Sequence, residues 1–155
     1  MRPLTRELAS RLRTAGDALI AGIDDDHWHR VPDPGTWSIG KEAEHVAEAA
    51  GYHQWIVRLT IGDTVSSSRR PVLERKQMTT ALSPHEAAEL IRQRVDEGVR
   101  LLLELTDEQL ALPTRPPRAN AAILADTIDR VLVGHFDPHR VAIEAKLRLS
   151  PTPRR

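Results

Sequence analysis

Two histidines lie four residues apart in the stretch VGHFDPHR, residues 133–140. On an α-helix His135 and His139 would share one face, with Cβ atoms about 5–6 Å apart, so both imidazoles could bind one metal ion. Pro138 directly precedes the second histidine. Proline lacks an N–H, and its ring crowds the carbonyl four residues earlier, here that of Gly134. We expect a helix that bends at Pro138 and continues, because apolar residues at helical spacing extend beyond it.

A metal site needs at least one more ligand, and His45 is the best candidate for it. This histidine lies between Ala43 and Val46 on the apolar face of a predicted helix. A buried neutral histidine must satisfy both ring nitrogens. A metal site does so when one nitrogen binds the ion and the other donates a hydrogen bond. The alternative is a set of ordinary core histidines, since chance alone gives such a pair in roughly one chain in four of this composition.

The other four histidines are weaker candidates for the third ligand. His27 and His29 follow an acidic run in a predicted loop, and His85 lies in the first turn of a predicted helix. We expect these three side chains to be solvated. His53, on the same predicted helix as His45, stays a candidate.

Four stretches carry apolar residues every three or four positions, which is the pattern of amphipathic helices. They cover residues 4–22, 38–60, 83–105 and 121–150. Ser38 is a predicted N-cap with Lys41 where Glu would complete a capping box, whereas Ser83 and Glu86 form a full box. Thr106 begins a short capped turn, and Asn120 is the predicted N-cap of the last helix.

Four helices predict an all-α fold, a four-helix bundle whose cofactor sites are built from facing helices. Loops rich in proline and glycine separate the helices, and residues 61–82 form a long connection between the second and the third. We expect one bundle domain over residues 1–150 and a flexible tail over residues 151–155.

The composition narrows the kinds of ligand and partner that suit the chain. Its 155 residues hold 22 basic and 22 acidic side chains and no cysteine. A chain without net charge has no strong electrostatic reason to bind nucleic acid or an anionic membrane. Without thiolates, a metal would be held by His, Asp or Glu. The absence of a long apolar run and the early arginines, Arg2, Arg6 and Arg11, predict a cytoplasmic protein.

Three residues near the histidines could take part in catalysis. At 100° per residue, Tyr52 is about 20° and Glu48 about 60° from His45 around the helix. Tyr52 could line the same pocket, and Glu48 could act as a general base. Arg140, next to His139, could bind a carboxylate. Each also has a purely structural interpretation: a packed tyrosine, a solvated glutamate and a surface arginine.

Two motifs together resemble the DinB/YfiT-like family of bacterial four-helix-bundle proteins. They are PGTWSIGKEAEHVAEA, residues 34–49, and VGHFDPHRVAIEAKL, residues 133–147. The matching features are the helix entry at Trp37, the histidine seven residues after Ser38 and the pair of histidines on the last helix. This chain departs from a frequent family pattern in which two adjacent histidines end the motif, because Pro138 and Arg140 flank His139.

The resemblance implies a divalent metal, commonly zinc or nickel, held by His45, His135 and His139. It also implies a thiol-dependent reaction, since family members include bacillithiol and mycothiol S-transferases, mycothiol-dependent maleylpyruvate isomerases and some metal-dependent hydrolases. Homodimers are common in the family. The resulting hypothesis is a metal-dependent transferase or isomerase acting on a small molecule with mycothiol or bacillithiol as cosubstrate. The alternative is a non-catalytic bundle that binds a metal or a small molecule, or that interacts with a partner.

Overall fold

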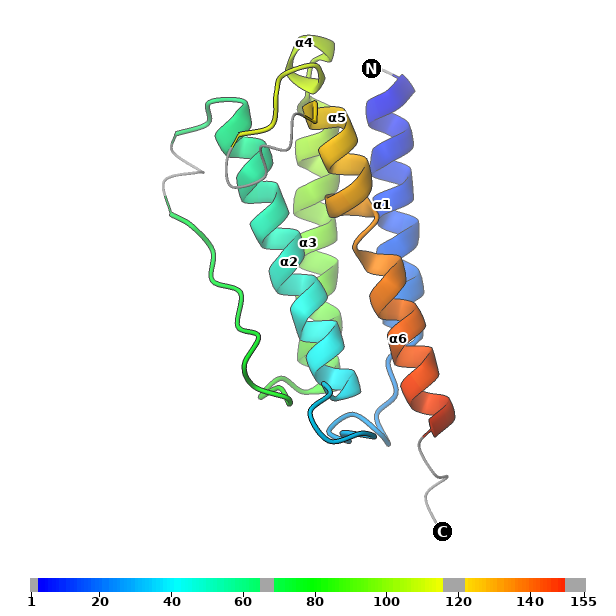
Figure 1. Cartoon of the computed structure of the whole chain (residues 1–155). Helices are drawn as coiled ribbons and strands as arrows, with labels where there is room; N and C mark the ends of the chain where they lie inside the picture. Colours follow the sequence, from blue (N-terminus) through cyan, green and yellow to red (C-terminus); the bar gives the residue numbers. More distant parts are fainter. Residues whose placement is uncertain (1–2, 65–68, 116–121, 150–155) are drawn as a thin grey trace.

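A computed structural model of the chain describes residues 3–64, 69–115 and 122–149. Four helical columns form a bundle (Figure 1). The described residues hold no β-strand, only an isolated bridge between Pro113 and Ile123. The elements are α1 (Pro3–Ala21), α2 (Ile39–Thr60), α3 (Pro84–Glu104), α4 (Asp107–Leu110), α5 (Leu124–Thr127), the π-helix η1 (Ile128–Val133) and α6 (Phe136–Leu149). The predicted all-α bundle is confirmed.

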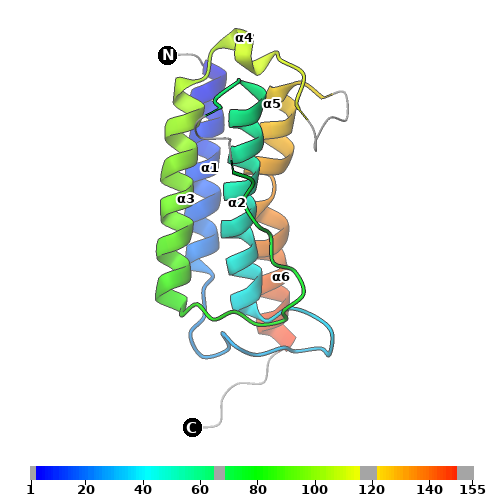
Figure 2. The ribbon, with the colours of Figure 1, turned by 90° about the vertical axis from the view of Figure 1, so that its left-hand side faces the viewer.

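The order of the columns explains the long connection between α2 and α3. Each of α1 and α2 packs against α3 on one side and against η1 and α6 on the other, so α1 and α2 lie diagonally opposite each other. Figures 1 and 2 show that α2 and α3 run in the same direction. A parallel pair of helices needs a connection that returns along the whole bundle, and residues 69–83 make that return beside α2.

Residues 69–82 of this connection, here called the strap, are attached to α2 and the loop before it. The Ser38 N–H donates to the Met78 carbonyl at 2.8 Å, and Trp28 Nε1 donates to the Leu82 carbonyl at 2.8 Å. Trp28 is almost fully buried. Because the strap covers the side of α2 that the other helices leave open, α2 carries buried residues on nearly every face.

Local sequence signals set the ends of three helices as predicted. Ser38 caps α2 by accepting from the Lys41 N–H, whereas Ser83 and Glu86 form a complete capping box at α3. Thr106 forms a second box at the start of α4. None of the described helices is long and apolar enough to span a membrane. The predicted tail over residues 151–155 and the predicted N-cap at Asn120 lie outside the described residues.

The prediction of one continuous last helix bent at Pro138 is wrong. That stretch is divided into α5, η1 and α6, and the chain leaves the helical path in a turn at Gly134 and His135. Pro138 lies in the first turn of α6, where its missing N–H costs nothing, and the interruption falls one turn earlier. The proline therefore begins a new helix instead of bending an existing one.

Candidate metal centre

The N-terminal half of α2 carries His45 into the interior, where only 4% of the residue is exposed. The opposite wall comes from the interrupted last column, which contributes His135 from the turn and His139 from the first turn of α6. Both of these histidines are half-buried. The site thus lies between two facing columns, closed on the α2 side and partly open on the α6 side.

The helix interruption depends on Gly134, which lies at the end of the π-helix. Its N–H donates to the Asp129 carbonyl at 2.9 Å, five residues back. A Cβ atom at this position would lie 2.6 Å from the Arg130 carbonyl oxygen, closer than real Cβ atoms come to another atom. Only glycine fits this close approach, and π-turns of this kind are frequent at functional sites. The turn that follows places the His135 ring toward α2.

The three imidazole rings converge on one point. Nε2 of His135 lies 3.1 Å from Nε2 of His45. Ring centroids are 5.2 Å apart for His45 and His135, 4.9 Å for His45 and His139, and 4.6 Å for His135 and His139. One ring nitrogen from each histidine lies within 4.8 Å of the others. The sequence prediction that these three residues come together is therefore confirmed as a cluster that could hold a metal.

A buried carboxylate fixes the orientation of one ring. Glu42 Oε2 lies 2.5 Å from Nδ1 of His139, and Glu42 Oε1 lies 3.1 Å from Nζ of Lys146. Burial alone would raise the pKa of Glu42, but the bonds from His139 and Lys146 outweigh it and lower that pKa. An ionised Glu42 accepts a hydrogen bond from the Nδ1–H of His139. Nε2 of His139 is then the nitrogen with the free lone pair, and it faces the cluster.

The protonation state of His45 suits a ligand. Burial is the largest of the effects that lower its pKa to about 4, and the neighbouring His139 and His135 add to it. The ring is therefore neutral at pH 7. Its Nδ1 is buried and has no hydrogen-bond partner within the described residues.

A divalent ion fits this donor set. Tetrahedral zinc with Zn–N bonds of about 2.0–2.1 Å separates neighbouring ligand nitrogens by about 3.3 Å, and the three nitrogens of the cluster lie within 4.8 Å of one another. The His139–Glu42 pair has the carboxylate–histidine arrangement that commonly supports a metal ligand. Three protein ligands leave a fourth position free, as in catalytic zinc sites. This free position faces the α6 side of the site, where His135 and His139 are only half-buried.

Sequence reasoning missed two of the residues that complete this centre. One is Trp37, whose ring lies 4.8 Å from that of His45 and 6.4 Å from that of His139. The other is Glu42, which supports His139. The available signal was its position three residues before His45, which places it on the same side of the helix.

The remaining histidines lie outside the three-ligand cluster. His53 is buried, and its ring packs edge-on against that of His135 at 5.4 Å. His29 and His85 are exposed as expected. The expectation that His27 is solvated is wrong, because only 14% of its side chain is exposed and its Nδ1 is paired with Asp24.

Glu48 and Tyr52 face the strap. Glu48 accepts a hydrogen bond from the Glu74 N–H at 3.2 Å, and burial raises the pKa of its carboxyl. The Tyr52 hydroxyl accepts from Nη2 of Arg70 at 3.2 Å, and the Arg70 guanidinium also lies over the Tyr52 ring. Both residues hold the strap against α2.

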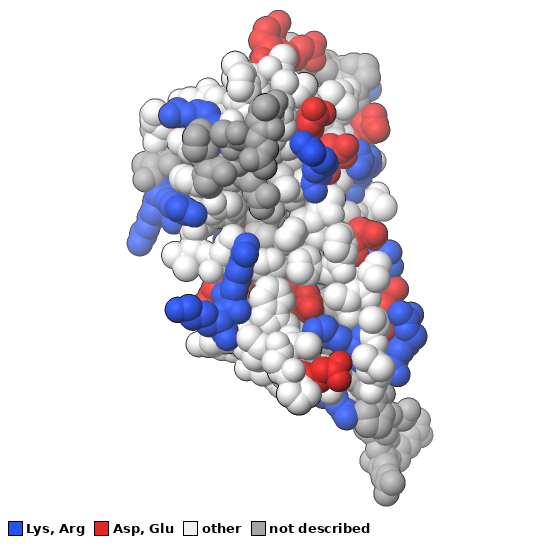
Figure 3. All heavy atoms as spheres, in the orientation of Figure 1, with Lys and Arg blue, Asp and Glu red and all other residues white. Residues whose placement is uncertain are grey.

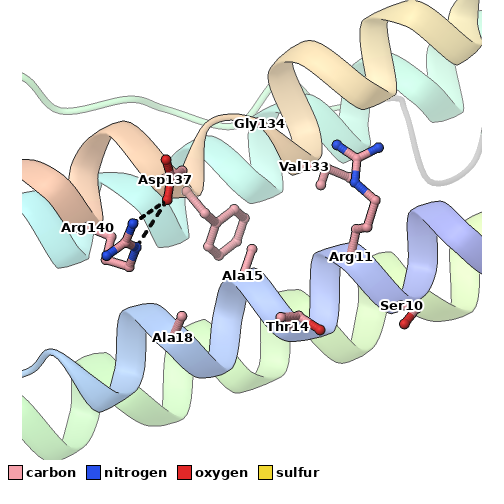
Figure 4. Close-up of a pocket in the computed structure, with 10 residues that line it drawn as sticks. Ser10, Arg11, Thr14, Ala15, Ala18, Val133, Gly134, Asp137 and Arg140 are labelled. Atoms are coloured by element: carbon pink, nitrogen blue, oxygen red, sulfur yellow. Dashed lines mark hydrogen bonds and ion pairs between the residues drawn. The ribbon is translucent and has the colours of Figure 1, made fainter.

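Arg140 lies on the α1 side of the last column. It is paired with Asp137 at 2.7 Å and with Glu144 at 2.6 Å. With Asp137 it lines a cavity of about 380 Å³ between α1 and the interrupted column, whose wall includes Ala15 (Figure 4). Its sequence neighbour His139 instead contacts Glu42 of α2.

A model of the DinB superfamily matches residues 8–135, which include α2, α3 and the first histidine of the VGHFDPHR stretch. No curated protein and no solved structure matches the chain.

Proposed function

The chain belongs to the DinB superfamily, and from that premise we propose that it is a divalent-metal-dependent enzyme that acts on a small molecule together with a thiol cosubstrate. His45, His135 and His139 would hold the ion, with zinc and nickel the favoured metals because neutral imidazoles suit both. The observation that carries the proposal is the convergence of these three rings, one of them held by the buried carboxylate of Glu42.

The chemistry that such an ion supplies is Lewis acidity, which lowers the pKa of a thiol or a water at the open position. The protein's own residues prepare that position. Glu42 keeps the Nδ1 proton of His139 in place, and Lys146 keeps Glu42 ionised. Trp37 covers one side of His45 and of His139 with an apolar ring, which limits the access of water.

A thiol cosubstrate would supply the nucleophile that the chain lacks. The chain contains no cysteine, so a reacting sulfur would come from outside the protein. Mycothiol and bacillithiol are the cosubstrates suggested by the family resemblance. In an S-transfer, the thiolate sulfur forms a bond to an electrophilic carbon of the substrate while the leaving group departs from that carbon with its electron pair.

The partial exposure of the cluster favours this proposal over a closed, purely structural metal site. His135 and His139 are half-buried, and 18% of the His139 side chain is accessible. A structural zinc site is closed by four protein ligands. The proposal gives Glu48, Tyr52 and Arg140 structural roles, because their hydrogen bonds and ion pairs hold the strap and the last column.

The test is a thiol-transfer assay on the metal-loaded protein. Zinc- or nickel-loaded protein is mixed with mycothiol or bacillithiol and with 1-chloro-2,4-dinitrobenzene, which releases chloride when a thiolate attacks. We expect metal-dependent consumption of the thiol, and a fall to the protein-free rate in His45→Ala. His85→Ala, which removes an exposed histidine outside the cluster, should keep the wild-type rate.

A loaded protein that never exceeds the protein-free rate with either thiol would contradict thiol transfer to this acceptor. The non-catalytic metal-binding bundle would then be the better account.

A further inference from the structure

A buried lysine of α2 has no part in the proposed chemistry. Only 1% of the Lys41 side chain is exposed, and its Nζ lies 3.4 Å from Oε2 of Glu44 and 3.0 Å from Oε2 of Glu74. Burial alone would lower the pKa of Lys41, but the bonds to Glu74 and Glu44 outweigh burial and raise that pKa. A buried ion pair adds little net stability, but it can fix one arrangement of the groups that it joins.

The group that Lys41 fixes is the strap. Four exposed basic side chains lie on the strap, those of Arg69, Arg70, Arg75 and Lys76. Figure 3 shows basic side chains gathered on the side of the molecule along which this connection runs. The single acid of the strap, Glu74, is half-buried instead and binds Lys41. The strap is therefore anchored to α2 at Glu74.

The strap reaches the metal centre at the next residue, Arg75, through its backbone. The Arg75 carbonyl accepts a hydrogen bond from Nε1 of Trp37 at 3.3 Å. The Trp37 ring lies 4.8 Å from the His45 ring and is stacked on the His139 ring at 6.4 Å. The backbone of Trp37 is held separately, because Nζ of Lys146 donates to its carbonyl at 2.6 Å. The strap thus fixes the far end of a side chain that packs against two of the three histidines.

We propose that Trp37 is a positioning residue of the metal centre and that the Lys41–Glu74 ion pair holds the strap where it fixes the indole. This inference rests on the proposed function and adds to it a control over how firmly the ion is held. An indole that is fixed at its far end restricts the two imidazoles that it touches. A ligand ring that cannot swing away releases its ion slowly, so the strap sets the rate at which the metal leaves.

The test measures how fast cobalt leaves the protein. Cobalt-loaded full-length protein is mixed with excess EDTA, and the decay of the cobalt ligand-field absorption gives the release rate. The same absorption before mixing reports the ligand geometry. We expect Trp37→Phe, which keeps an aromatic ring without the N–H, to release cobalt roughly two- to tenfold faster than the wild type, which is the range of one lost hydrogen bond.

Two variants test the anchor. Lys41→Met should also release cobalt faster, because Glu74 loses its partner while an apolar chain of similar volume keeps the buried site filled. Glu74→Gln breaks the same pair from the half-exposed strap and should match Lys41→Met, so the anchor stays testable if the buried substitution does not fold. Both act through the same indole, so neither should add to the release rate of Trp37→Phe in a double variant.

Arg70→Gln is the matched control, because Arg70 joins the strap to α2 at Tyr52 and not at Trp37. It should keep the wild-type release rate and absorption. Wild-type release in Trp37→Phe, or effects that multiply in the double variant, would overturn the positioning role and leave the metal centre in place. Wild-type release in both anchor variants, or equally fast release in Arg70→Gln, would overturn the anchor. A wild-type protein that never binds cobalt would overturn the metal centre and this inference with it.

Discussion

At the scale of single residues, Glu42 is the buried group that supports the three-histidine cluster from behind. It binds Nδ1 of His139 at 2.5 Å, and only 7% of the residue is exposed. Losing the charge would weaken the bond that fixes which nitrogen of His139 faces the cluster. Carboxylates that support a metal-binding histidine typically contribute 10–100-fold to metal affinity.

We therefore predict that Glu42→Gln lowers zinc affinity by about 10–100-fold, measured by competition with a chelator of known affinity. Glu44→Gln serves as the control, because Glu44 lies on the same helix but pairs with Lys41 instead of a histidine. Equal zinc affinity in Glu42→Gln and the wild type would show that the carboxylate does not support the ligand set.

The three-histidine cluster could be predicted from the sequence, whereas the carboxylate behind it could not. The spacing of His135 and His139 and the apolar surroundings of His45 are visible in the sequence. Glu42 lies three residues before His45 and Glu48 lies three residues after it, so the helical spacing alone does not select Glu42. Its burial arises from the approach of α6, which supplies both His139 and Lys146.

At the scale of elements, the interruption of the last column sets the position of His135. The apolar period runs on both sides of Gly134, so the sequence predicts one helix through it. The π-helix η1 adds one residue to a helical turn. Because η1 is short, the apolar spacing in the sequence continues through it without a visible interruption. By contrast, α2 and α3 carry explicit caps at Ser38 and Ser83, and their predicted starts are confirmed.

We predict that Gly134→Ala destabilises the fold by about 1–3 kcal/mol and weakens metal binding. The added Cβ would lie 2.6 Å from the Arg130 carbonyl oxygen and 3.0 Å from that of Asp129, so the backbone must shift next to His135. Urea unfolding of the metal-free protein gives the free energy of unfolding, and a chelator competition gives the metal affinity.

Gly22→Ala is the matched control, because a Cβ there would meet its nearest atom at 3.5 Å, an ordinary contact. If both variants unfold at the same urea concentration as the wild type, the close approach at Gly134 does not constrain the turn.

At the scale of the whole molecule, the parallel pairing of α2 and α3 requires a connection that returns along the bundle. The length of that connection was visible in the sequence, but its path was not, because a segment without helical period gives no sign of which helix it will cover. The path beside α2 closes the exposed side of that helix and brings Arg75 next to Trp37.

A metal ion would join α2 to the last column, since His45 comes from one and His135 and His139 from the other. The most direct test of this account is the metal content of the purified, untagged protein after incubation with zinc or nickel and removal of excess ion. The account predicts one ion per chain in the wild type and almost none in His139→Ala. The same metal content in both proteins would contradict the three-histidine centre.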